Sequence, residues 1–167
     1  MNKRLKRVLQ NAVYAAMYVA LCFVFQPISF AAIQVRIAEA LCILALFDDM
    51  AVVSVSIGCF IANILLSGII DAIFGSFATF FGMYLIKYIK TDNFFLKMLP
   101  TVLSNAFIIP FVLRIAFGET MPIYLLMITI AIGEVVSIHG IGYALYNALL
   151  KTNLFPTKKR FKILWWR

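Results

Sequence analysis

The sequence predicts an all-α polytopic membrane protein with six transmembrane helices, and three observations lead to this prediction. Hydrophobic residues make up 64% of the 167 residues, whereas soluble domains contain roughly 45–50%. Several apolar stretches approach or exceed the ~20 residues that a helix needs to cross a ~30 Å hydrocarbon core. The basic residues behind the net charge of +8 stand at the ends of these stretches, which indicates membrane topology and anionic lipid rather than nucleic-acid binding.

Polar, glycine and proline residues mark the helix ends, because a helix that is hydrophobic all round has no periodicity to interpret. The first three spans end at Gln26-Pro27, Asp48-Asp49 and Ser67-Gly68. The predicted helices cover residues 8–25, 35–47, 50–66, 71–89, 98–117 and 121–150, and a basic tail follows at residues 151–167. Together they use nearly the whole chain. We therefore expect one integral membrane domain over residues 1–167, with no separate catalytic domain.

The second span is unusually short. At ~1.5 Å per residue, residues 35–47 cover only about 20 Å, which fits a re-entrant segment as well as a crossing helix. Three basic clusters decide the choice, because the positive-inside rule places all of them in the cytoplasm and six crossings achieve this. We expect cytoplasmic N- and C-termini, with outer connections at residues 27–34, 67–70 and 118–120. The clusters are Lys3, Arg4, Lys6 and Arg7; Lys87, Lys90 and Lys97; and Lys151, Lys158, Lys159, Arg160, Lys162 and Arg167.

Charged side chains in the outer halves of the spans are costly in hydrocarbon, so each predicts an interior partner or a ligand. Arg36 and Glu39 stand three residues apart, a spacing that fits an ion pair within one helix as well as a ligand role. Asp71 opens the fourth span, where a carboxylate either caps the first turn or contacts a ligand. Small residues continue its face at helical spacing and leave a groove for a neighbouring helix or a flat ligand. These residues are Gly75, Ala78, Thr79 and Gly82.

Glu134 is the most informative acid, because it lies well inside the sixth span, about two turns below the expected outer surface. At that depth its side chain cannot reach water by snorkelling. Either it pairs with Arg114 or His139, or it accepts hydrogen bonds from a donor-rich ligand, which is the interpretation that we favour. Ser137 extends the same face three residues further on.

Two amides, Asn63 and Asn105, lie within the third and fifth spans, and buried amides need hydrogen-bond partners. Hydrogen bonds between helices are the simpler explanation, and hydrogen bonds to a ligand are the alternative. His139 has no second His or Cys at metal-ligand spacing, so we expect no metal site and a hydrogen bond to a neighbouring helix. Cys22, Cys42 and Cys59 are expected to be buried apolar residues, whereas Phe30, Phe74, Tyr124 and Tyr143 are rings that could stack on a planar ligand.

Alanines recur at positions 12, 16 and 20 of the first span. A stripe of small residues lets helix backbones approach closely in a membrane, so Ala12, Ala16 and Ala20 predict a docking surface for another helix of this chain or of a partner. No Walker motif, nucleotide-binding loop, nucleophile elbow or zinc signature occurs in the sequence. We expect neither an enzyme nor a cofactor, and coupling to ATP would need another chain.

Three blocks in the chain resemble the queuosine-precursor transporter family, whose members are substrate-binding subunits (S components) of energy-coupling factor (ECF) transporters. The blocks are residues 34–41 (QVRIAEAL), residues 58–63 (GCFIAN) and residues 71–79 (DAIFGSFAT). The resemblance runs from the first span through Glu134. Three blocks in the same order are far more specific than any single motif.

The resemblance implies an ECF S-component-like bundle of six helices that binds a queuosine-related 7-deazaguanine from outside. It implies coupling to an ECF module of one transmembrane T subunit and two ATPases, in which case the alanine stripe is the surface that docks on the T subunit. A self-sufficient ion-coupled carrier, with Glu134 and Asp71 as proton sites, is the alternative.

A 7-deazaguanine presents adjacent N–H donors, and one carboxylate can accept two of them. Glu134 is the acid that we assign to this edge. An aminomethyl-bearing precursor would add a cation, for which Asp71 or Glu39 is a suitable counter-charge, and the two amides could recognise the carbonyl oxygen. The predicted substrate-binding set is therefore Arg36, Glu39, Asn63, Asp71, Asn105 and Glu134.

Overall fold

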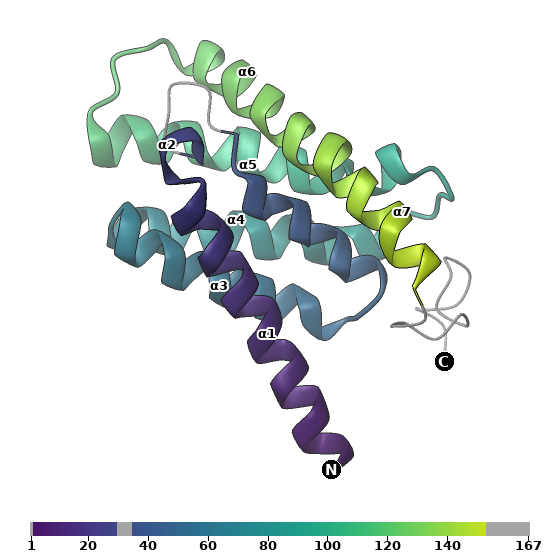
Figure 1. The fold of residues 1–167 in the computed structure, drawn as a ribbon. Coiled ribbons are helices and arrows are strands. Elements are labelled where there is room, and N and C mark those ends of the chain that lie inside the picture. The colour runs from purple at the N-terminus through teal and green to yellow at the C-terminus, as the bar shows by residue number, and fades with distance from the viewer. Residues whose placement is uncertain (1, 30–34, 153–167) are drawn as a thin grey trace.

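A computed structural model of the chain describes residues 2–29 and 35–152, and every element in these ranges is helical (Figure 1). α2 follows α1 directly, η2 extends α4, and α6, η3 and α7 form one continuous helix, so the elements group into six helical segments as predicted. The bounds are α1 Lys3–Val24, α2 Gln26–Ser29, η1 Ile37–Leu46, α3 Met50–Leu66, α4 Ile69–Leu85, η2 Ile86–Tyr88, α5 Phe94–Phe117, α6 Ile123–Glu134, η3 Val135–Gly142 and α7 Tyr143–Lys151.

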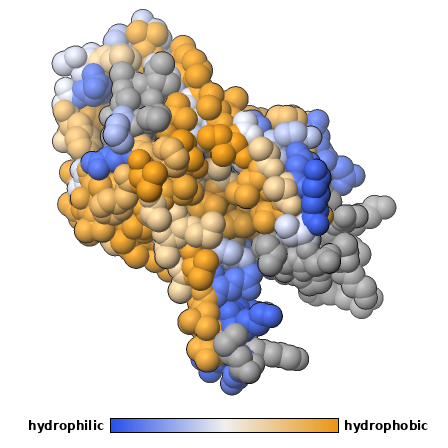
Figure 2. Space-filling view, in the orientation of Figure 1, coloured by the Kyte–Doolittle hydropathy of each residue, from blue (hydrophilic) through white to orange (hydrophobic). Residues whose placement is uncertain are grey.

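Four of the six segments are long and apolar enough to cross a membrane, by length and composition. They cover Arg4–Val24, Ile69–Tyr88, Phe94–Phe117 and Ile123–Lys151, whereas Ile37–Leu46 and Met50–Leu66 are shorter apolar helices. On the face seen in Figure 2, hydrophobic residues cover the middle, and hydrophilic residues gather toward the two ends. The prediction of an all-α membrane bundle is thus confirmed in its helices and in four candidate membrane spans.

Successive segments run in alternating directions, as short connections require. The start of α1, the end of α7 and the connections between η1 and α3 and between α4 and α5 lie toward one end of the bundle (Figure 1). The connections between α3 and α4 and between α5 and α6 lie toward the other end, next to α2. The basic residues at the start of α1, those between α4 and α5, and Lys151 at the end of α7 therefore lie toward one end of the described structure. Which end faces the cytoplasm stays a prediction.

The second segment differs in kind from the expected α-helix, because η1 is a ten-residue 3₁₀-helix. At about 2.0 Å per residue it spans roughly 20 Å, close to the length expected from sequence. Every residue from position 38 to position 46 is buried, since η1 runs between α1, α3 and η3. A 3₁₀-helix is narrower than an α-helix, and η1 also contains the small residues Ala38, Ala40 and Ala45. Both features let the neighbouring helices pack closely around η1.

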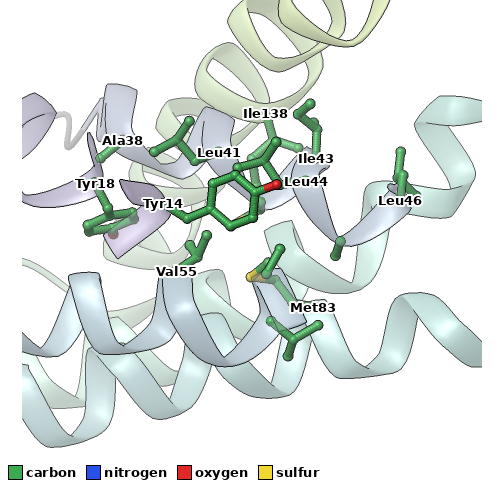
Figure 3. Close-up of a cluster of buried hydrophobic side chains, with 14 of the residues drawn as sticks. Tyr14, Tyr18, Ala38, Leu41, Ile43, Leu44, Leu46, Val55, Met83 and Ile138 are labelled. Carbon is green, nitrogen blue, oxygen red and sulfur yellow. The ribbon is translucent and has the colours of Figure 1, made fainter. Parts of the chain in front are cut away.

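The larger apolar core surrounds η1. Tyr14, Tyr18 and Cys22 recur every four residues along α1 and are all buried, so they form its inward face. In Figure 3 the two tyrosines lie close to side chains of η1 and to Val55 of α3. The core thus joins α1, η1 and α3 into one packed unit, to which Met83 of α4 and Ile138 of η3 also belong.

The backbones of α1 and α3 nearly touch at Gly58. A Cβ atom at this glycine would lie 2.7 Å from the carbonyl oxygen of Ala15 and 2.8 Å from Cβ of Tyr18. Real Cβ contacts are not that short, so only glycine fits unless α1 moves away. The close approach of α1 to α3 therefore depends on this one position.

Replacing Gly58 by alanine should destabilise the protein, because the added methyl group meets main-chain atoms that cannot rotate away. We expect a loss of about 1–3 kcal/mol, or a melting temperature lower by roughly 2–12 °C, in detergent-solubilised protein. Gly140→Ala is the matched control, since a Cβ atom there meets nothing within 4 Å. Equal melting temperatures for the two variants would contradict the proposed contact.

Candidate functional site

Buried polar side chains gather around the start of η1. Arg36 is 5% exposed, Asp71 is 1% exposed and Glu39 is inaccessible. Ionised groups at such depth require partners within the protein, because the loss of hydration costs several kcal/mol per ion. The contacts of each group therefore show what it is for.

Arg36 forms an ion pair with Asp71, 35 residues further along the chain. Its Nη2 atom lies 3.1 Å from Oδ2 of the carboxylate. Arg36 precedes the first residue of η1 and has a non-helical backbone (φ −82°, ψ 87°), so the helical spacing that suggested a pair with Glu39 does not apply to it. Asp71 lies in the first turn of α4, where the helix dipole favours a negative charge. The N-cap of α4 is Gly68, so the capping explanation for Asp71 is replaced by ion pairing.

Asn63 supports the same ion pair from α3. Its Nδ2 atom donates to the backbone carbonyl of Asp71 at 3.3 Å, which confirms the expected hydrogen bond between helices. A Cβ atom at Gly75 would lie 2.7 Å from this Nδ2 atom and 3.3 Å from Oδ1 of Asp71. Gly75 therefore makes room for the polar group, and the small-residue groove on α4 is occupied here by a side chain of a neighbouring helix.

Glu39 is held by neutral donors from three elements. Tyr18 of α1 and Thr79 of α4 both donate to Oε1, the latter at 3.1 Å, and the Cys42 thiol of η1 donates to Oε2 at 3.0 Å. Both carboxylate oxygens therefore have a partner within the protein. These bonds assign Glu39 mainly to holding α1, η1 and α4 together.

Glu134 is the last residue of α6, and Asn105 of α5 lies beside it. Both are 2% exposed. Among the described residues, Oε2 of Glu134 and both polar atoms of the Asn105 amide lack a partner at hydrogen-bond geometry. Glu134 is the last of the 12 residues of α6, so it lies about 16 Å from the start of that helix at ~1.5 Å per residue.

The two partners considered for Glu134 are engaged elsewhere. Arg114 donates to the carbonyl of Met121 at 2.6 Å, and Nε2 of His139 lies 2.9 Å from the carbonyl of Phe95. The expected hydrogen bond from His139 to a neighbouring helix is thereby confirmed. Among the residues that the structure describes, Glu134 lies beside the Asn105 amide, and its Oε2 atom has no hydrogen-bond partner.

Apolar clusters lie on both sides of the Glu134–Asn105 pair. Ile130 lies one turn before Glu134 on α6, and Ile109 lies one turn after Asn105 on α5. Both are on the side of the pair that faces the connection between α5 and α6, and both belong to a small hydrophobic cluster. Ile138 and Val102 stand about one turn in the opposite direction and belong to the larger core. The pair is therefore a polar layer between two apolar ones, which is where a membrane protein can enclose a polar ligand.

The helix changes its winding directly after Glu134. Residues Val135–Gly142 form a π-helix, and such segments are frequently found at functional sites because they shift side-chain register and widen the helix. The Ser137 hydroxyl donates a hydrogen bond to the carbonyl oxygen of Gly133 at 2.9 Å, so its partner is the backbone of its own helix. η3 packs directly against η1, where a Cβ atom at Gly142 would lie 3.0 Å from Ile43.

The predicted docking stripe and the predicted stacking rings both face outward. Alanines 12, 16 and 20 are exposed, opposite the buried face of α1 that carries Tyr14 and Tyr18. Phe74, Tyr124 and Tyr143 are also exposed, while Phe30 and residues 153–167 of the tail lie outside the described residues. No group of three metal-ligating side chains occurs among the described residues.

Sequence reasoning missed Tyr18 and Cys42 as members of the polar cluster and undervalued Thr79. The available signal for Tyr18 was its position four residues after Tyr14, on the face of the first span away from the alanine stripe. Nothing in the sequence indicated that its hydroxyl meets Glu39.

The described chain is an all-helical bundle with four candidate membrane spans and buried charged side chains. These features define a membrane protein whose interior carries a candidate site for a polar or charged ligand. Residues 8–151 match the model of the QueT transporter family. The chain is also similar to the queuosine precursor transporter QueT of Lactococcus lactis subsp. cremoris (strain MG1363), with 30% identity over 139 residues that cover 76% of this chain and 82% of that protein. The chain belongs to the QueT transporter family. No solved structure matches it.

Replacing Arg36 by methionine should leave the Asp71 carboxylate buried without its cation. We expect a loss of about 3–5 kcal/mol in unfolding free energy, measured by denaturation in detergent micelles. The double variant Arg36→Met/Asp71→Leu removes both charges and should recover at least half of that loss. Losses in the double variant equal to the sum of the two single variants would show that the pair is not coupled.

Proposed function

We propose that the chain is the substrate-binding S component of an ECF-type importer and captures a queuosine precursor or a related 7-deazaguanine. The observation that carries this proposal is the Glu134–Asn105 pair. Both residues are 2% exposed, and Oε2 of Glu134 and the polar atoms of the Asn105 amide have no hydrogen-bond partner within residues 2–29 and 35–152. The family is one of transporters, which favours binding and transport over catalysis. The name of the Lactococcus relative supports the ligand class.

The polar atoms of the pair match the hydrogen-bonding edge of a 7-deazaguanine. That edge carries two adjacent N–H donors beside a carbonyl oxygen. A carboxylate accepts both donors, and an amide Nδ2 donates to the oxygen. Glu134 and Asn105 supply these two groups from facing helices, α6 and α5. A ligand in this position satisfies atoms that otherwise lose hydrogen bonds on burial.

The other predicted binding residues form a second group. Arg36, Asp71 and Asn63 are linked to one another by the contacts described above, and Oδ1 of Asp71 has no hydrogen-bond partner among the described side chains and backbone. Arg36 is within electrostatic range of Glu134. We assign this group to the end of the ligand opposite the edge bound by Glu134 and Asn105. We assign Glu39 to holding together the helices that carry the group.

Energy for import would come from a partner module of one transmembrane T subunit and two ATPases, since the sequence has no nucleotide-binding motif. The exposed alanine stripe on α1 supports docking of the T subunit there, because small residues facing away from the core are free for a second helix. The N- and C-termini are placed in the cytoplasm by the positive-inside rule, with ligand entering from the opposite side.

Glu134→Gln should weaken binding of a 7-deazaguanine more than tenfold, because an amide cannot accept two N–H donors with both of its polar atoms. Titration of the purified chain measures the affinity, and its melting temperature checks the fold. Glu119→Gln is the matched control, since this acid is exposed near the connection between α5 and α6. Unchanged affinity in Glu134→Gln would reject the assignment.

Ala16→Leu should abolish ATP-dependent uptake in liposomes that contain the chain and its partner module, while ligand binding by the lone chain stays within about twofold. The added side chain keeps the helix backbones apart. Ala144→Leu places the same change at an exposed position of α7 and should retain uptake. Uptake by the lone chain under a proton gradient, without ATP, would instead support the ion-coupled carrier.

A further inference from the structure

A cavity of about 410 Å³ lies between α1, η1 and α7, and we call it the α1–α7 cavity. It is at the end of the bundle where α1 starts and α7 ends (Figure 1). Its volume is within the ~300–1,000 Å³ of small-molecule sites. It shares no lining residue with the Glu134–Asn105 pair or with the group around Arg36, so it is a separate site. The lining residues are Lys6, Gln10, Tyr14, Met17, Leu41, Leu44, Leu145 and Leu149.

Each of the three helices gives one face to the α1–α7 cavity. The lining residues of α7 are four positions apart, as are the first three of α1, and this spacing places side chains on one side of an α-helix. Leu41 and Leu44 are three positions apart in η1, which is one turn of a 3₁₀-helix. They are 2% and 5% exposed and form the floor of the cavity. Figure 3 shows them close to Tyr14.

The α1–α7 cavity is long and mainly apolar. Lys6 and Met17 mark its two ends on α1, about 16 Å apart at ~1.5 Å per residue. This distance is close to half of the ~30 Å hydrocarbon core, which is the depth of one leaflet. Leucine and methionine side chains make up most of the lining. One acyl chain of a membrane lipid matches both the length and the apolar lining.

The polar groups of the cavity stand toward the start of α1. The Lys6 side chain is exposed and brings a positive charge. Tyr14 accepts a hydrogen bond from Gln10, so its own O–H can donate to a ligand. The nearby acid Asp48 is engaged, because its Oδ1 accepts from the backbone N–H of Met50 at 3.0 Å and its Oδ2 lies 3.5 Å from Nε2 of Gln10. A cation and a donor above an apolar floor fit an amphipathic ligand with an anionic head group.

The charge of the surrounding surface favours the same ligand. Described basic side chains outnumber acidic ones at this end of the bundle, and the positive-inside rule assigns it to the cytoplasm, where the leaflet contains anionic lipid. The basic tail beyond residue 152 has the same sign of charge as Lys6, which disfavours the tail as the occupant. The basic residues are Arg4, Lys6, Arg7, Lys87, Lys90, Lys97 and Lys151, and the acids are Asp48, Asp49 and Asp92.

We propose that the α1–α7 cavity binds one anionic phospholipid, with the phosphate at Lys6 and an acyl chain over Leu41 and Leu44. Gln10 is one turn from Lys6 and holds the Tyr14 hydroxyl, which is thereby placed to donate to an ester oxygen below the phosphate. The binding goes beyond the proposed function and does not depend on it, because the lipid is a component of the membrane and not the transported ligand.

Two lipids with equal acyl chains test the proposal without any mutation. The purified full chain is delipidated in detergent and given equal amounts of dioleoylphosphatidylglycerol and dioleoylphosphatidylcholine. Native mass spectrometry should show one retained lipid, with a preference of about fivefold for phosphatidylglycerol, the effect of one lysine near anionic lipid. Equal retention of the two lipids would overturn the preference for an anionic head group. A chain that retains neither lipid would overturn the site.

A charge variant tests the place of the head group. Lys6→Gln should reduce the preference for phosphatidylglycerol to less than about twofold, because it removes the cation at the mouth of the cavity. Arg4→Gln is the matched control, since it removes the same charge from an exposed residue of α1 that does not line the cavity. Equal losses in the two variants would overturn the role of Lys6.

A second variant tests the place of the acyl chain. Leu145 is partly buried and lines the cavity, so Leu145→Trp should fill the space and remove most of the retained phosphatidylglycerol. Ala148→Trp adds the same ring at an exposed position of α7 and should keep the lipid. Melting temperatures identify variants that fail to fold, and Leu149→Trp replaces Leu145→Trp in that case. Unchanged retention in the folded variant would overturn the proposed position of the acyl chain.

Discussion

The hydrogen bonds to the inaccessible Glu39 carboxylate are the interaction on which much of the structure depends. A charge sealed inside an apolar bundle is tolerated only when its oxygens accept hydrogen bonds from the protein. Tyr18 and Thr79 meet this need from α1 and α4, so both helices must stay next to η1. Because Glu39 is fixed at the start of η1, Arg36 three residues earlier comes within reach of Asp71 at the start of α4.

Two non-α segments pack against each other near the polar layer. η1 is wound as a tight 3₁₀-helix and η3 as a wide π-helix, and they are direct neighbours. The close approach at Gly142, where a Cβ atom would meet Ile43 at 3.0 Å, shows how little space separates them. Long 3₁₀ and π stretches are unfavourable alone, so tertiary packing stabilises both. Because η3 begins directly after Glu134 and packs with η1 in the larger apolar core, this core holds Glu134 in place.

Sequence patterns predicted the segments well and the polar contacts poorly. The third helix was predicted at residues 50–66 and observed at Met50–Leu66, because polar and glycine residues mark both of its ends. The 3₁₀ winding of η1 could not be predicted, since its apolar sequence suits either helix and packing decides. The Arg36–Asp71 pair was missed because helical spacing was applied to a residue just outside the helix. The sequence predicts correctly that Glu134 is buried, since an ionisable side chain deep in an apolar span faces the bundle interior and not the lipid.

One helix connects the polar cluster to the exterior. Tyr18 of α1 reaches Glu39 on the inner face, while Ala16 and Ala20, two residues before and after it, lie on the exposed face. The side chain that contacts Glu39 and the two exposed alanines are thus neighbours on one helix and point to opposite sides of it. The contact at Gly58 clamps the same stretch of α1 to α3. A single turn of α1 therefore contributes Tyr18 to the core and to the hydrogen bonds of the polar cluster, and Ala16 to the outer surface.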